Sequence, residues 1–138
     1  MAELLVELRF DTASKQPCYH VLRNGEEDFS GFKDLKEDTV IGSDAGWQVI
    51  IQADGESITE IDNLVVNEEK RDQSKNWQDI WEQIPQAGEY NGRPAWIGTV
   101  KEGIGTPEDP WFNGWTLYYT TADGTKRHLD PDWEVPPA

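Results

Sequence analysis

The residues whose types could carry out chemistry are few and lie far apart in the chain. Cys18 and His20 are two positions apart, so on a strand both side chains would share one face, as a thiol and its general base require. The other histidine, His128, lies near the opposite end of the chain. No phosphate-binding glycine loop and no Gly-x-Ser-x-Gly elbow is present. We therefore expect no catalytic residues and no enzymatic activity, with Cys18 a small buried side chain.

Metal ligation has little support in the spacing of the ligand-type residues. Neither Cys-x-x-Cys nor His-Glu-x-x-His occurs, so no metal site and no cofactor is predicted. Calcium is the alternative, because several acids lie in or beside turns that contain glycine or proline, where oxygen ligands can converge. The same acids can instead hydrogen-bond their own turns. They are Asp44, Asp54, Asp123, Asp130 and Asp132.

A glycosidase uses a pair of carboxylates, but carboxylates are so abundant in this chain that close pairs of them are not evidence for such an enzyme. The chain has 27 Asp and Glu against 12 Lys and Arg, and its formal net charge is -15. Most of the excess lies in the N-terminal half, where we expect an acidic surface suited to a basic partner. The residues assigned to that surface are Glu26, Glu27, Asp28, Glu37 and Asp38.

Aromatic residues are the least ordinary feature of the composition. There are 7 Trp, and two of them lie where packing is less assured. Trp111, followed by Phe112, is in a loop rich in proline and glycine, and Trp133 is in a proline-rich C-terminal segment. Exposed tryptophans stack on sugars or anchor protein interfaces, whereas buried ones would fasten the loop and tail to the sheet. We take Trp111, Phe112 and Trp133 as candidate binding residues, together with Tyr90 and Arg93.

Short strands are the elements that would position these residues. Alternating or β-branched runs separated by turn residues predict about eight or nine strands. The dipeptides Asn24-Gly25 and Asn91-Gly92 predict tight turns. The exception is the spacing of Trp77, Ile80, Trp81 and Ile84, which is that of one helical face and predicts a helix over 74–84.

The predicted fold is a single-domain, mostly-β structure: an antiparallel sandwich or barrel with one short amphipathic helix. The domain would span residues 1–129, and residues 130–138 would form an extended proline-rich tail. The chain has 138 residues, which suits one domain. An aromatic content of 11% argues against disorder despite a mean hydropathy of -0.73.

The composition also limits the partners. A sequence pI of about 4.3 argues against direct binding of nucleic acid or of an anionic membrane, and no apolar run is long enough to cross a bilayer. The first residues carry Glu3 and Glu7 and do not resemble a signal peptide. We expect a soluble cytoplasmic protein, with a virion component as the alternative.

Two functions follow from these observations. The first is a non-catalytic, acidic protein-interaction domain that binds a basic partner as an inhibitor, antitoxin-like protein or adaptor. The alternative is a glycan-binding β-sandwich that uses the loop tryptophans and could be virion-associated. The sequence favours the first because charge is its strongest signal.

Overall fold

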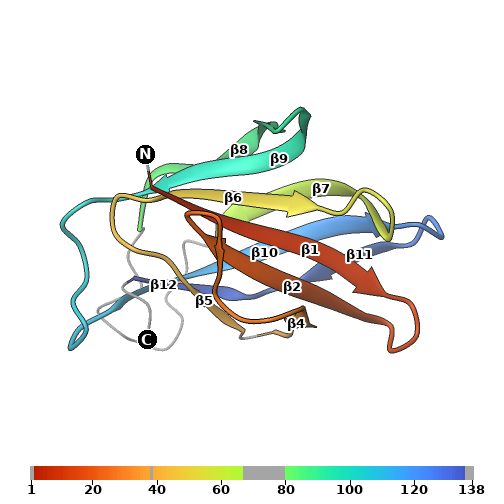
Figure 1. Ribbon diagram of the computed structural model, residues 1–138, viewed down its shortest axis with the longest axis horizontal. Helices are drawn as coiled ribbons and strands as arrows, with labels where there is room; N and C mark the ends of the chain where they lie inside the picture. Colours follow the sequence, from red (N-terminus) through yellow and green to blue (C-terminus); the bar gives the residue numbers. More distant parts are fainter. Residues whose placement is uncertain (1, 38, 67–79, 136–138) are drawn as a thin grey trace.

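A computed structural model describes residues 2–37, 39–66 and 80–135, and within them the chain forms strands and no helix. The strands build two sheets that pack face to face (Figure 1). This arrangement confirms the predicted β-sandwich architecture. The sheets are mixed rather than purely antiparallel, because β1 runs parallel to β6 and β5 runs parallel to β12. Both parallel pairs join strands that are far apart in the sequence, as parallel pairing requires.

The first sheet has the order β3-β2-β1-β6-β9-β8, with β4 also paired to β2. Its strands are β1 (Glu3–Asp11), β2 (Gln16–Arg23), β3 (Glu26–Glu27), β4 (Lys33–Asp34), β6 (Gln48–Ala53), β8 (Trp81–Tyr90) and β9 (Arg93–Val100). The alternation predicted for the first strand is observed: Leu4, Val6 and Leu8 of β1 are buried.

The second sheet is centred on β10. Its strands are β5 (Val40–Gly42), β7 (Ile58–Val66), β10 (Trp111–Thr121), β11 (Lys126–Leu129) and β12 (Asp132–Val135). β7 pairs with one side of β10, while β11 and β12 follow each other along the other side in one continuous register. Residues 132–135 of the predicted tail are therefore an integral strand of this sheet, and residues 136–138 lie outside the described part of the chain.

Tryptophans fill one end of the core between the sheets. Trp115 and Trp133 are both fully buried, and their rings stack with centroids 5.0 Å apart. Trp81 meets Trp133 edge-on at 5.6 Å, and its indole N–H donates to Oδ1 of Asn113 at 2.9 Å. These large side chains supply apolar area that a chain with few aliphatic residues needs for a stable core.

The helix predicted over 74–84 is not formed by the residues that the structure describes. Ile80 is buried just before β8 and Trp81 to Ile84 begin β8, whereas positions 74–79, including Trp77, lie outside the described residues. Ile84 is 44% exposed, so it shares no buried face with Trp81. Pairing with β9 overrides the local helical spacing. Pro85 is tolerated because β8 is an edge strand with irregular register in this region.

The two Asn-Gly dipeptides form the turns that the sequence predicts. Asn24 and Gly25 have φ angles of 50° and 83°, and Asn91 and Gly92 have φ angles of 51° and 75°. Two successive residues with positive φ match the right-handed twist of the flanking strands. The second of these turns closes the β8–β9 hairpin, which carries Tyr90 and Arg93 at its tip.

Candidate functional site

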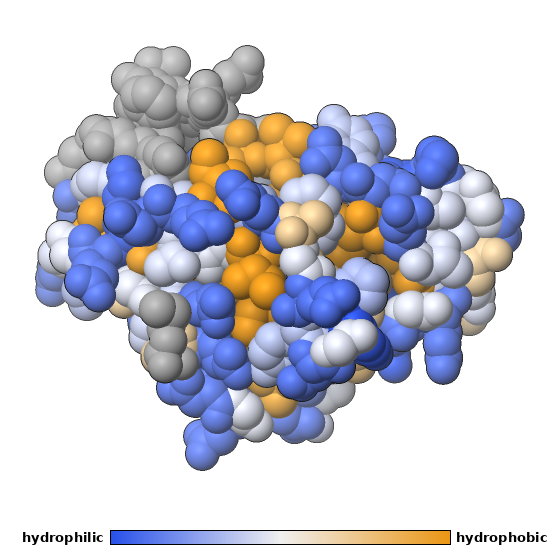
Figure 2. All heavy atoms as spheres, turned by 90° about the horizontal axis from the view of Figure 1, so that it is seen from above, coloured by the Kyte–Doolittle hydropathy of each residue, from blue (hydrophilic) through white to orange (hydrophobic). Residues whose placement is uncertain are grey.

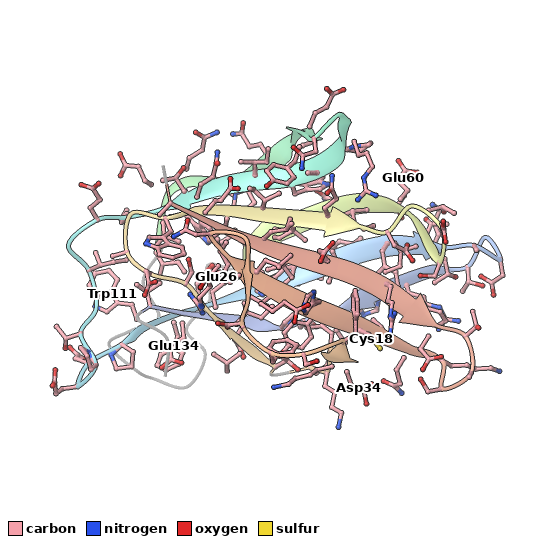
Figure 3. All side chains as sticks on the ribbon, in the orientation of Figure 1. Cys18, Glu26, Asp34, Glu60, Trp111 and Glu134 are labelled. Carbon is pink, nitrogen blue, oxygen red and sulfur yellow. The ribbon has the colours of Figure 1, made fainter. Side chains whose placement is uncertain are left out.

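The side chains considered for chemistry are held by different neighbours. Cys18 lies on β2 beside Asp34, with Sγ 3.7 Å from the carboxylate oxygen Oδ1 (Figure 3). Burial raises the pKa of the Cys18 thiol, and the negative charge of Asp34 raises it further. A thiol held in its protonated form is a poor nucleophile. His128 is on β11 in the other sheet.

His20 is held by structural contacts. Its Nδ1 lies 3.2 Å from a carboxylate oxygen of Glu7, and its Nε2 lies 3.1 Å from the carbonyl oxygen of Phe29. The rings of Phe29 and Phe32 pack against the imidazole at centroid distances of 5.8 and 5.3 Å. The imidazole therefore fastens the loop after β3 to the first sheet.

Of the acids considered for calcium, Asp54 and Asp123 accept hydrogen bonds within their own turns, whereas Asp130 accepts one from the Thr116 hydroxyl of β10. Asp54 accepts hydrogen bonds from the backbone N–H groups of Glu56, Ser57 and Ile58. Partial burial opposes ionisation of Asp54, but these bonds and the Ser57 hydroxyl outweigh it and lower its pKa. Among the residues that the structure describes, no three His, Cys, Asp or Glu side chains converge as a metal site would require.

The residues assigned to an acidic surface lie along one edge of the first sheet and in the loop after it. Glu26 and Glu27 are exposed on the edge strand β3, and Glu37 is exposed beyond β4. Asp28 is exposed but paired, since its Oδ1 lies 2.9 Å from Nε of Arg23. Asp38 lies outside the described residues. The edge therefore presents the carboxylates of Glu26 and Glu27 to solvent.

The predicted aromatic binding residues are placed in different surroundings. Trp133 is fully buried in the tryptophan cluster, so its ring faces no solvent. Trp111 and Phe112 are half-buried at the start of β10, and Trp111 packs against the core. The ring of Tyr90 is fixed through its hydroxyl group, which donates to Oε1 of Glu3 at 2.9 Å. Arg93 of the predicted set lines a hollow.

That hollow is a groove of about 510 Å³ between β7 of the second sheet and the β8–β9 hairpin of the first. Seen from the side of β8 and β9, hydrophobic atoms reach the surface in a band bordered by hydrophilic side chains (Figure 2). One wall of the groove carries Thr59, Glu60 and Asp62 of β7, and the other carries Arg93 and Trp96 of β9. Glu60 and Trp111 lie at opposite ends of the molecule, so Trp111 is not part of this groove (Figure 3).

Trp96 enters the groove because of its position in the sheet. In β9 it lies opposite Ile51 of β6 and Ala87 of β8, on the face that packs toward the core. Its ring contacts the core but is only half-buried, since the groove leaves part of it uncovered. A half-buried aromatic ring beside polar side chains is the usual composition of a small-ligand site.

The polar side chains of the groove offer both donors and acceptors. The guanidinium of Arg93 is anchored by a hydrogen bond from Nη2 to the carbonyl oxygen of Ala53 at 3.2 Å, which leaves further N–H donors. Glu60 and Asp62 of β7 line the same groove, and a carboxylate is an acceptor of hydrogen bonds. This mixture suits a neutral, hydroxyl-rich ligand better than an ion of either sign.

Sequence reasoning selected Arg93 but missed Trp96, Glu60 and Asp62. The available signal was that Arg93 lies in the predicted turn immediately before the predicted strand 95–100, which contains Trp96. Nothing local indicated that this strand would face β7, which belongs to the other sheet.

Comparisons with known proteins assign no family to this chain. No protein-family model matches the chain, and no curated protein is found to be similar to it. In the described part of the chain, no helix of the length and apolarity needed to cross a membrane is present.

Proposed function

We propose that this chain is a non-catalytic saccharide-binding domain that holds a neutral pyranose ring in the groove between β7 and the β8–β9 hairpin. The observation that carries the proposal is the half-buried indole of Trp96 in one groove with Glu60, Asp62 and Arg93. This keeps the glycan-binding alternative of the sequence analysis and moves the binding surface from the loop tryptophans to β9.

The chemistry of a sugar ring matches this lining. One face of a pyranose presents C–H groups, which pack on the electron-rich face of an indole. The hydroxyl groups at the ring edge both donate and accept hydrogen bonds. Glu60 and Asp62 would accept from them, while Arg93 and Thr59 would donate.

Charge favours neutral sugars over acidic ones. The chain carries a net charge of -15, and two carboxylates line the groove against the single guanidinium of Arg93. A sialylated, uronic or sulfated glycan would therefore be repelled. Binding of neutral sugars should accordingly tolerate salt, because no net charge is being neutralised.

The test is a glycan array that holds both neutral and acidic glycans, followed by calorimetric titration of the neutral glycans retained. We expect the Trp96→Ala variant to bind at least about tenfold more weakly, because it removes the stacking surface. Ala87→Phe should also weaken binding, since Ala87 is an exposed residue of the groove directly opposite Trp96.

Trp111→Ala is the matched control, because it removes another half-buried tryptophan far from the groove. If the wild-type protein retains no neutral glycan, or if the Trp111 and Trp96 variants lose binding equally, the proposal is wrong. Release of shorter sugars from a bound oligosaccharide would contradict its non-catalytic part.

A basic protein partner is the second candidate, and the exposed carboxylates of β3 favour it specifically. An acidic edge would steer association with a positively charged surface and make it sensitive to salt. The test is capture of partners from the host lysate at low and high salt, using wild type and the double variant Glu26→Lys/Glu27→Lys.

The control for this second test is Glu89→Lys/Glu108→Lys, which makes the same change in net charge at exposed positions elsewhere. A partner lost only with the β3 variant would support the candidate. A partner retained by both variants, or no partner at either salt, would contradict it.

A further inference from the structure

A second hollow lies on the outer face of the second sheet, next to the groove. It is shallow, has a volume of about 440 Å³, and is lined by Asp62, Asn63, Tyr118, Lys126, Arg127 and His128. Its centre is the ring of Tyr118, which is 41% exposed on the middle strand of the sheet. An exposed aromatic ring at the centre of a sheet face has no role in the core.

Cross-strand pairing fixes the surroundings of Tyr118. In register, Asn63 of β7 lies on one side of Tyr118, and His128 of β11 lies on the other. Residues opposite each other in adjacent strands share one face of a sheet. The Tyr118 and His128 rings have centroids 6.0 Å apart and planes tilted by 34°, so two aromatic rings lie next to each other on this face.

Polar groups border this surface and are held in place. Oδ2 of Asp62 accepts a hydrogen bond from the Thr120 hydroxyl at 2.6 Å. The ammonium group of Lys126 lies 3.4 Å from Oδ1 of Asp62 and 3.1 Å from the Thr120 hydroxyl. The charge of Lys126 is thus partnered by a carboxylate of the same hollow.

Asp62 connects the two hollows, since it lines both the groove and the Tyr118 surface. It lies at the irregularity in the pairing of β7 with β10, where the register shifts between Tyr118 and Tyr119. An irregularity of this kind re-aims side chains at a sheet edge. β7 is also an edge strand, so a ligand that leaves the groove reaches the outer face by passing one strand.

We infer that the Tyr118 surface is a second sugar subsite, and that the protein binds an extended neutral oligosaccharide rather than a single sugar. The chain of sugars would run from Trp96 in the groove, past Asp62, to Tyr118. This inference rests on the proposed saccharide-binding function and adds the length of the ligand to it.

The experiment is calorimetric titration with neutral cello-, manno- and laminari-oligosaccharides of increasing length, from the monosaccharide to the hexasaccharide. For wild type, affinity should rise with length by at least about tenfold across a series that binds. Tyr118→Ala should remove most of that gain and leave the affinity for the shortest binding sugar unchanged. Trp96→Ala should weaken binding at every length.

Val65→Ala is the matched control, because Val65 is 40% exposed on the neighbouring strand of the same sheet and does not line the hollow. It should leave every affinity unchanged. Tyr118 is an exposed residue, so its alanine variant should keep the wild-type thermal midpoint, which circular dichroism checks.

The outcomes separate the inference from the function on which it rests. If sugars bind and Trp96→Ala weakens them, but affinity is independent of length or of Tyr118, the second subsite is wrong and the groove stands. If wild type binds no sugar of any series, the saccharide-binding function is wrong and the subsite is wrong with it.

Discussion

Single side chains in this protein act mostly through short-range hydrogen bonds that hold turns and loops. Asp54 accepts hydrogen bonds from three backbone N–H groups, and Asp123 accepts one from the Thr125 N–H at the tip of the β10–β11 hairpin. Two of the acids considered as cation ligands, Asp54 and Asp123, are thus engaged in their own turns. The same interactions make the stability of the fold depend on the ionisation of individual carboxylates.

Asp123 gives a prediction for the pH dependence of stability. Hydrogen bonds from the Thr121 hydroxyl and the Thr125 amide lower its pKa from 3.8 to about 2. A carboxyl group whose pKa is lowered in the folded state stabilises the fold above its ordinary pKa and loses that contribution as pH falls toward its folded value. We therefore expect Asp123→Asn to lose less stability than wild type between about pH 4 and pH 2.

The measurement is the urea midpoint of unfolding at pH 7, 4 and 2.5 for both proteins. Glu89→Gln serves as the control for removing an exposed carboxylate. Equal acid sensitivity of wild type and Asp123→Asn would contradict the assignment.

At the scale of elements, the groove depends on how β8 and β9 fit together. Gly98 of β9 lies against the irregular part of β8, where a Cβ atom would come within 2.8 Å of the Gln83 carbonyl oxygen and of the Pro85 nitrogen. These are backbone atoms that cannot rotate away. Gly98 is therefore needed for the close approach that lets a proline-containing segment pair as a strand.

We predict that Gly98→Ala lowers the free energy of unfolding by about 2 kcal/mol or more, because the clash forces the two strands apart. Gly88→Ala is the matched control: it lies on the paired strand, and its Cβ would meet only Ile97 at an ordinary 3.7 Å. Chemical denaturation measures both. A Gly98→Ala variant as stable as the Gly88→Ala variant would show that the close approach is unimportant.

For the whole molecule, the dominant property is a net charge of -15 on a sandwich with a solvent-accessible area of 7462 Å². Few of these charges are neutralised by ion pairs among the described residues, where the shortest Arg–Asp contact is Arg23 to Asp28 at 2.9 Å. Like charges on one compact surface repel each other and destabilise the folded state. Solvent ions should relieve this repulsion.

We expect the thermal midpoint to rise by a few degrees between about 10 mM and 1 M sodium chloride, since the screening length falls from about 30 Å to about 3 Å. The less negative variant Glu89→Lys/Glu108→Lys should show a smaller rise. Scanning calorimetry at each salt concentration measures both. An unchanged or falling midpoint for wild type would argue that the acids are spaced too widely to repel.

The amino-acid sequence by itself determined most of the local structure. Alternation along residues 3–10 predicts β1, the segment 47–52 with its β-branched residues predicts β6, and both Asn-Gly dipeptides form the turns expected of them. These features can be predicted from the sequence because they depend only on neighbouring residues. Side chains alternate along a strand, and Asn-Gly accepts the positive φ angles of a tight turn. The acidic character follows from the composition, which has 27 Asp and Glu against 12 Lys and Arg.

Tertiary structure alone decided which residues meet. It turned Trp81–Ile84 into a strand through pairing with β9, and it placed Trp133 in the core through pairing of β12 with β10. It also brought Trp96 opposite β7 across the opening between two sheets. These outcomes depend on contacts between distant parts of the chain, whose free energies exceed local propensities and leave no pattern in a short window of sequence.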